Sequence, residues 1–178
     1  VFVLTLASLK ANFFDQLKVC GDPIYKLNQY WEFVSTVGQP DVVALLSRAL
    51  DLSMQFINDK KGAWMVNIKK ESNFEELADA DKKAINEQID EMIASKYEHL
   101  SYNGLTRGIM SRITDEFTKN PFDNSVVVID EVHNFVSRIV NKIKGKLKKS
   151  ISYRLYEYLM SAENVRIVVL SGTPIINY

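Results

Sequence analysis

The stretch VVVIDEVH, residues 126–133, decides the fold that we predict for this chain. Its first four residues are all β-branched, a pattern typical of a strand buried on both faces of a parallel sheet. Asp130 and Glu131 follow that strand directly. Because open α/β sheets bind ligands at the carboxyl ends of their strands, the pair stands where a ligand is expected.

Adjacent carboxylates at a strand end suit two tasks in nucleotide hydrolysis. Asp130 would hold the Mg²⁺ that bridges two phosphates, and Glu131 would orient or deprotonate the attacking water. Acidic residues also begin many helices because of the helix dipole. The pair alone therefore leaves a purely structural interpretation open, and His133, two residues further on, favours the functional one.

A second stretch, VVLSGTP at residues 168–174, repeats the pattern of an apolar strand that ends in polar residues. We predict residues 165–170 to be a second buried strand of the same character. Ser171 and Thr173 can each donate and accept hydrogen bonds, so they can link a neighbouring carboxylate or histidine to moving parts. By itself this stretch favours a plain strand-to-turn junction. The two stretches together, on successive predicted strands, indicate a functional site.

Strands and helices alternate around these two stretches, which predicts an α/β fold. The expected class is a three-layer sandwich with a mostly parallel sheet and helices on both faces. Its predicted strands are 1–6, 97–102, 126–129 and 165–170, and its predicted helices follow Ser8 and cover 105–117, 134–143 and 152–162. Residues 22–96 contain strand-like stretches at 29–37 and 63–68 and helix-like stretches at 40–57 and 81–96.

Composition restricts the class of protein further. The 178 residues suffice for one domain, and 22 Lys and Arg balance 22 Asp and Glu, so no net charge draws the chain to nucleic acid or membrane. The single cysteine, Cys20, excludes an internal disulfide and a cysteine-rich zinc site. We expect it to be a small buried side chain in a reducing, intracellular compartment. No apolar run approaches the roughly 20 residues of a membrane span, so no membrane partner is expected.

Four motifs resemble those of superfamily 2 helicases. Asp130-Glu131-Val132-His133 resembles the DExH-box, and Ser171-Gly172-Thr173-Pro174 resembles motif III in its S-G-T-P form. Thr5-Leu6-Ala7-Ser8-Leu9 is similar to motif Ia, with Leu6 in place of the usual proline. Ser101-Tyr102-Asn103-Gly104-Leu105 resembles the T-Y-x-x-L segment of Snf2-like members. The fuller strings IDEVHNF and LSGTPIIN are most similar to helicases of poxviruses and other large DNA viruses, the group of the early transcription factor small subunit and nucleoside triphosphatase I.

The resemblance implies a RecA-like ATP-binding lobe that runs from motif Ia to motif III over residues 1–178, with 22–96 as a family-specific insertion. ATP would be the substrate and Mg²⁺ the cofactor. By this resemblance Asp130 would coordinate Mg²⁺, Glu131 would be the catalytic base, and His133 would report the nucleotide state. Motif III, with Ser171, Gly172, Thr173 and Pro174, would couple hydrolysis to nucleic-acid movement, and backbone phosphates would be contacted by Thr5, Ser8 and Lys10.

The resemblance also implies partners. These would be DNA or RNA, a second RecA-like lobe of the same parent chain, and viral RNA polymerase or transcription factor subunits, in the virion or in a viral factory of the host cytoplasm. One departure stands out, because no G-x-x-x-x-G-K-[ST] phosphate loop occurs in the chain. We interpret VFVLTLASLK, which lacks an initiator Met, as a strand cut from a longer chain that carries this loop upstream. The isolated piece is therefore expected not to hydrolyse ATP.

Three alternatives stay open at this stage. The lysine-rich stretch 142–149 is interpreted as a solvated loop, with a phosphate-contacting loop as the sharper alternative. His99 has no second ligand nearby in the sequence, which favours a core or surface histidine. For the whole protein, the alternative to an ATP-driven motor is a non-catalytic RecA-like module that serves interactions in a transcription complex.

Overall fold

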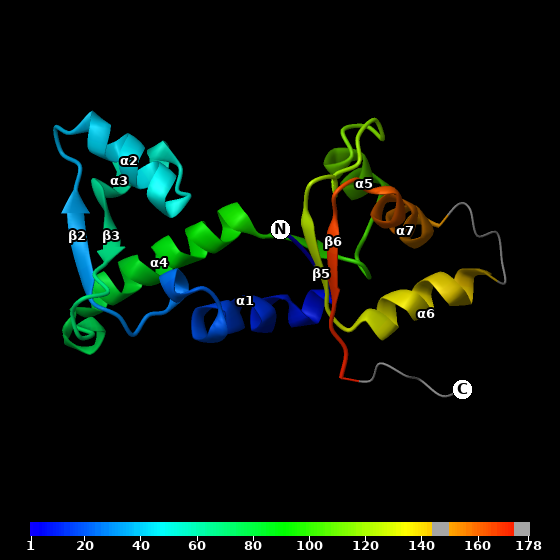
Figure 1. The fold of residues 1–178 in the computed structure, drawn as a ribbon, viewed down its shortest axis with the longest axis horizontal. Helices are drawn as coiled ribbons and strands as arrows, with labels where there is room; N and C mark the ends of the chain where they lie inside the picture. The colour runs from blue at the N-terminus through cyan, green and yellow to red at the C-terminus, as the bar shows by residue number, and fades with distance from the viewer. Residues whose placement is uncertain (144–149, 173–178) are drawn as a thin grey trace. The chain divides into compact units, whose positions relative to one another are not determined.

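The computed structural model describes residues 1–143 and 150–172, and it is an α/β structure (Figure 1). The chain divides into two compact units. One combines Val1–Lys10 with Tyr97–Tyr178, and the other is Ala11–Lys96. Among the described residues, no helix is long and apolar enough to cross a membrane.

The first unit is built on a four-stranded parallel sheet, which confirms the predicted fold class. Its strands are β1 (Phe2–Thr5), β4 (Glu98–Ser101), β5 (Val126–Ile129) and β6 (Arg166–Val169), in the order β4-β1-β5-β6. All three neighbouring pairs are parallel, and Leu4 of β1 stands opposite Leu100 on one side and Ile129 on the other. The predicted strand 126–129 is found with the same bounds.

Three helices of this unit cover one face of the sheet, as Figure 1 shows. They are α5 (Arg107–Ile113), α6 (Val132–Ile143) and α7 (Ile151–Ser161). Leu4, Leu100 and Ile129 share that face by register and pack with Phe135 of α6 and Leu155 of α7 in one buried cluster. Because the strands are parallel, their carboxyl ends lie along one edge, directly beside the start of α6.

The prediction that residues 165–170 form a buried strand is wrong. β6 is the edge strand of the described sheet and pairs only with β5. All four of its residues are exposed, and Val169 retains 56% of its accessible surface. A run of β-branched residues reports an apolar environment on average, and it does not distinguish a central strand from an edge strand.

Two predicted helices are shorter than their apolar periodicity indicated. The stretch 40–57 is divided into α2 (Pro40–Leu50) and α3 (Met54–Lys60). Asp51 ends α2 in a left-handed conformation with a φ of 53°, and the Ser53 hydroxyl caps α3 by accepting from the Phe56 backbone N–H. The helix predicted over 105–117 ends at Ile113, because the backbone turns left-handed shortly afterwards, from Asp115 to Phe117.

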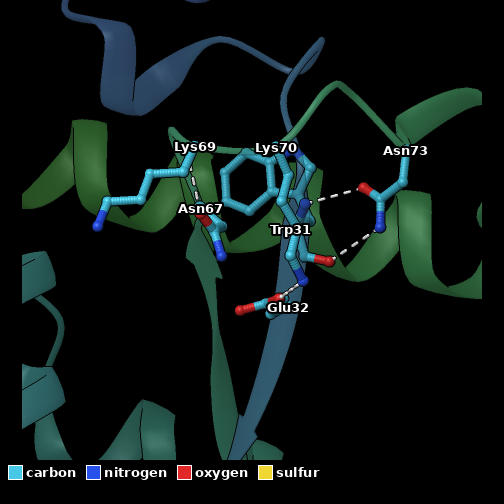
Figure 2. A network of polar contacts seen from close by, with 6 residues as sticks. All are labelled: Trp31, Glu32, Asn67, Lys69, Lys70 and Asn73. Carbon is cyan, nitrogen blue, oxygen red and sulfur yellow. Dashed lines mark hydrogen bonds and ion pairs between the residues drawn. The ribbon is translucent and has the colours of Figure 1, made fainter.

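The second unit contains an antiparallel pair, β2 (Trp31–Ser35) and β3 (Gly62–Val66), with α4 (Asp79–Lys96) and most of α1 (Lys10–Cys20). Side-chain amides occupy positions that a third strand would take. Asn73 accepts from the Trp31 N–H at 2.8 Å and donates to its carbonyl at 3.1 Å (Figure 2), and Gln88 makes the same two bonds to Trp64 at 2.8 Å each. Both edges of the pair are thereby partly satisfied.

Two further features of this unit concern the sequence predictions. Cys20 is exposed at the end of α1, so the expectation that it is buried is wrong. The Cys20 thiol donates to the Gln16 carbonyl one turn earlier, and no residue of α1 is buried, although cysteine is usually among the most buried residue types. The unit Ala11–Lys96 contains the segment 22–96. That this segment is an insertion within a RecA-like lobe stays a prediction.

Candidate functional site

The acidic pair lies at the carboxyl end of β5, in the turn that leads into α6. The Asp130 backbone N–H donates to the Leu4 carbonyl at 2.9 Å, which continues the pairing of β5 with β1. On the other side, the Leu170 N–H donates to the Ile129 carbonyl at 2.8 Å, and the Val132 N–H donates back to the Leu170 carbonyl at 3.1 Å. The turn is therefore held from both neighbouring strands.

The two carboxylates are partly buried and differ in their surroundings. Oδ1 of Asp130 accepts from the Glu131 backbone N–H at 3.0 Å, which fixes the Asp130 side chain against the turn. Glu131 has a φ of 49°, in the left-handed region that side chains other than glycine rarely adopt, and its side chain is 34% exposed. A partly exposed carboxylate on a fastened turn can meet a ligand with little rearrangement.

His133 connects this turn to the end of β6. Its Nδ1 lies 3.0 Å from the Ser171 hydroxyl and 3.2 Å from Oε2 of Glu131. Sequence reasoning placed these three residues in one site, and the structure brings them together. Because one ring nitrogen serves two partners, a change at the Glu131 carboxylate must also alter the contact with Ser171.

Only part of the second motif lies within the described residues. Ser171 is half-buried, and Gly172 is exposed with open space where a Cβ would stand. The predicted site residues Thr173 and Pro174 lie outside the described residues. The same holds for most of the lysine-rich stretch 142–149, and no side chain of that stretch is described.

The structure covers Thr5, which was predicted to contact a backbone phosphate. Thr5 is fully buried, and its hydroxyl donates to the Leu6 carbonyl at 2.8 Å. His99 Nε2 lies 3.1 Å from the Thr5 hydroxyl oxygen. Since the hydroxyl already donates to Leu6, His99 acts as the donor to it. Burial first, and then the charge of Lys10, keep the pKa of His99 below its ordinary value.

Ser8 and Lys10, predicted with Thr5 to contact phosphates, are both exposed. Ser8 does not cap the helix that follows it, because it lies inside a 3₁₀ turn, Ala7–Leu9, whose N-cap position is Leu6. Asn103 fastens this turn by accepting from the Ala7 N–H at 3.2 Å. The segment after β1 thus reaches solvent at the same sheet edge as the acidic pair.

Tyr102 is a residue of this site whose place sequence reasoning did not identify. It is 2% exposed, and its hydroxyl lies 3.3 Å from the Asp130 carbonyl and 3.4 Å from the Glu131 carbonyl. Burial, and then the charges of Asp130 and Glu131, raise the pKa of Tyr102. Two signals were available in the sequence: Tyr102 ends the predicted strand 97–102, and it lies in the segment 101–105 that resembles T-Y-x-x-L.

The arrangement suits a metal ion bound mainly by nucleotide phosphates better than a metal site built from three or more side chains. Among residues 1–143 and 150–172, no group of three or more His, Cys, Asp or Glu side chains could hold a metal ion. Mg²⁺ needs only one or two carboxylates when a nucleotide supplies phosphate oxygens. Asp130, whose Oδ1 bonds to the turn, can supply such a carboxylate at the strand end.

Comparison with known proteins finds similarity over part of the chain. Over 57 residues the chain is 40% identical to a protein of Acanthamoeba polyphaga mimivirus named "Putative ATP-dependent RNA helicase". The matched segment is 30% of this chain, and it spans 7% of the length of that relative. No family model matches the chain, and no solved structure matches it. The similarity indicates a relationship to helicases over a short segment.

Proposed function

We propose that this chain is part of an ATP-dependent nucleic-acid helicase or translocase that couples Mg-ATP hydrolysis to movement on DNA or RNA. One observation carries the proposal. The acidic pair at the end of β5 and the Ser171 hydroxyl at the end of β6 meet at one sheet edge, joined through His133. The partial similarity to an ATP-dependent RNA helicase supports the same class.

Each residue has a task that its position allows. The Asp130 carboxylate would hold Mg²⁺, which supplies charge neutralisation on the nucleotide phosphates when it is bound. The Glu131 carboxylate would orient the attacking water and accept its proton. A proton gained by Glu131 changes what its neighbour His133 can donate, and that change reaches Ser171 on the adjacent strand.

Nucleic acid is the proposed partner at the same edge. Ser8 and Lys10 are exposed just beyond the end of β1, and hydroxyl groups and lysines are common contacts of backbone phosphates. Within the unit formed by 1–10 and 97–178, Lys and Arg outnumber Asp and Glu. We also propose a second RecA-like lobe and viral transcription subunits as partners. A phosphate loop from another segment would contribute to ATP binding.

The test uses the full-length parent protein. ATP turnover is measured with and without DNA and RNA in the wild type, in Glu131→Gln and in Glu157→Gln, a control that removes an exposed carboxylate from α7. We expect Glu131→Gln to lower kcat by about 100-fold or more, as loss of a general base does. Equal turnover in the wild type and Glu131→Gln would exclude the assigned role.

The same measurement distinguishes the alternative function. A non-catalytic interaction module in a transcription complex would show no nucleic-acid-stimulated turnover in the wild-type parent. The chain contains no G-x-x-x-x-G-K-[ST] loop, so the isolated 178-residue chain is expected not to turn over ATP in either case. Steady turnover by the isolated chain would contradict this expectation.

A further inference from the structure

Tyr102 stands at the same sheet edge as the acidic pair but comes from a different strand. It follows β4 directly, and its backbone N–H donates to the Thr5 carbonyl at 3.3 Å, so it extends the pairing of β4 with β1. Its side chain is almost fully buried in the cluster under α5 and α6. The ring centroid lies 5.7 Å from that of Phe135 on α6, which fixes where the hydroxyl points.

The hydroxyl ends at the backbone of the acidic turn. It can donate to the Asp130 carbonyl at 3.3 Å or to the Glu131 carbonyl at 3.4 Å. Both distances are long for an O–H···O bond, as is usual when one donor is shared between two acceptors. The Glu131 carbonyl also accepts from the Asn134 N–H at 2.9 Å, so the first turn of α6 depends on the same oxygen.

This turn needs such support because its backbone conformation is unfavourable. Glu131 holds a left-handed φ of 49°, and a side chain persists there only when the surrounding contacts determine it. This backbone conformation sets the direction in which the Glu131 side chain leaves the turn, and the contact of its carboxylate with His133 at 3.2 Å orients the far end. A donor that binds both carbonyls of the turn therefore supports the position from which the carboxylate is presented.

We propose that Tyr102 is a positioning residue that holds the Asp130–Glu131 turn in the orientation that nucleotide hydrolysis requires. This inference rests on the proposed ATPase function. The hydroxyl acts through the two backbone carbonyls and touches no reacting group. The strand β4, which is separated from β5 by β1, thereby contributes to the site, although it carries no acidic residue at this edge.

The first test is Tyr102→Phe in the full-length parent, which removes the hydroxyl and keeps the ring in the core. We expect kcat to fall about 3- to 10-fold with little change in KM for ATP, the effect of losing about one hydrogen bond. Tyr156→Phe is the matched control, because Tyr156 is 38% exposed on α7 and far less constrained. It should leave kcat unchanged.

A double-mutant cycle separates positioning from a general loss of stability. When Glu131→Gln is already present, Tyr102→Phe should cause a smaller loss in single-turnover hydrolysis than it does in the wild type, because one of the two carboxylates that the turn presents has already been removed. If Tyr102→Phe lowers the rate by the same factor in both backgrounds, the inference is wrong. If the wild type is active and Tyr102→Phe has the same kcat, the inference is also wrong. If the wild type shows no ATP turnover, the proposed function itself is wrong.

Discussion

Replacing Glu131 with glycine and with alanine separates the backbone cost at this position from the function of its carboxylate. Glu131 has a φ of 49°, where a residue with a Cβ is less stable than glycine by about 1 kcal/mol. Both variants lose the carboxylate and its 3.2 Å contact with His133, so that loss cancels when they are compared. At ordinary helix or strand positions alanine is the more stable residue by roughly 0.5–1 kcal/mol.

We therefore expect Glu131→Gly to be more stable than Glu131→Ala by about 1 kcal/mol, which is about a fivefold difference in the opening equilibrium. The ATP turnover of the parent should be lost in both variants. If Glu131→Gly is the more stable variant and is inactive, the strained backbone conformation of Glu131 serves the function of its carboxylate and does not serve stability.

The assay must report on the correct unit. Trp31 and Trp64 both belong to the unit Ala11–Lys96, so tryptophan fluorescence does not follow the unit that contains Glu131. Hydrogen exchange of the backbone amides of β1 and β5 follows the unit that contains Glu131. Exchange should be about five times slower in the glycine variant than in the alanine variant, with equal fluorescence transitions. Faster exchange in the glycine variant would refute the argument from backbone conformation.

Two further predictions concern buried hydrogen bonds. Gln88→Met leaves the Trp64 N–H and carbonyl without their partner. We expect the unfolding free energy, followed by tryptophan fluorescence, to fall by roughly 2 kcal/mol or more. Gln55→Met, at an exposed position, is the control and should leave it unchanged. Burial keeps the pKa of His99 below its ordinary 6.5, so the neutral form is favoured in the folded state. The unfolding free energy should fall as the pH drops below about 6.5 through the folded pKa. His99→Gln, which can still donate to Thr5, should lose this pH-dependent part of the unfolding free energy. If the variant keeps the pH profile of the wild type, His99 is not its source.

Local residue types predicted much of the parallel sheet and the location of the candidate site. The four β-branched residues of β5 gave a strand with the bounds that the structure shows, because such side chains suit a pleated, half-buried surface. The expected burial on both faces is not found, since Val126 is exposed. The common edge for Asp130 and Ser171 followed from parallel pairing, in which all carboxyl ends point the same way. The contact of His133 with Ser171 is consistent with this common edge.

Other parts of the site could not be predicted from local patterns. Thr5 was expected to face a nucleic acid, yet it is buried against His99, because the depth of a side chain depends on what packs over it. The helix predicted over 105–117 ends early, because left-handed residues follow Ile113 and none of them is a glycine that would mark the turn in the sequence. The contact of Tyr102 with the acidic turn joins residues that are 28 and 29 positions apart.

The sequence by itself determined where strands end in polar residues and therefore which carboxylates stand at the ligand-binding edge of the sheet. This was readable because strand formation and chain direction depend on neighbouring residues. Only the tertiary structure decided which side chains are exposed there: that β6 is an edge strand, that Thr5 is covered and that Tyr102 reaches the turn. Burial and long-range hydrogen bonds arise when distant segments pack together, and no local pattern contains them.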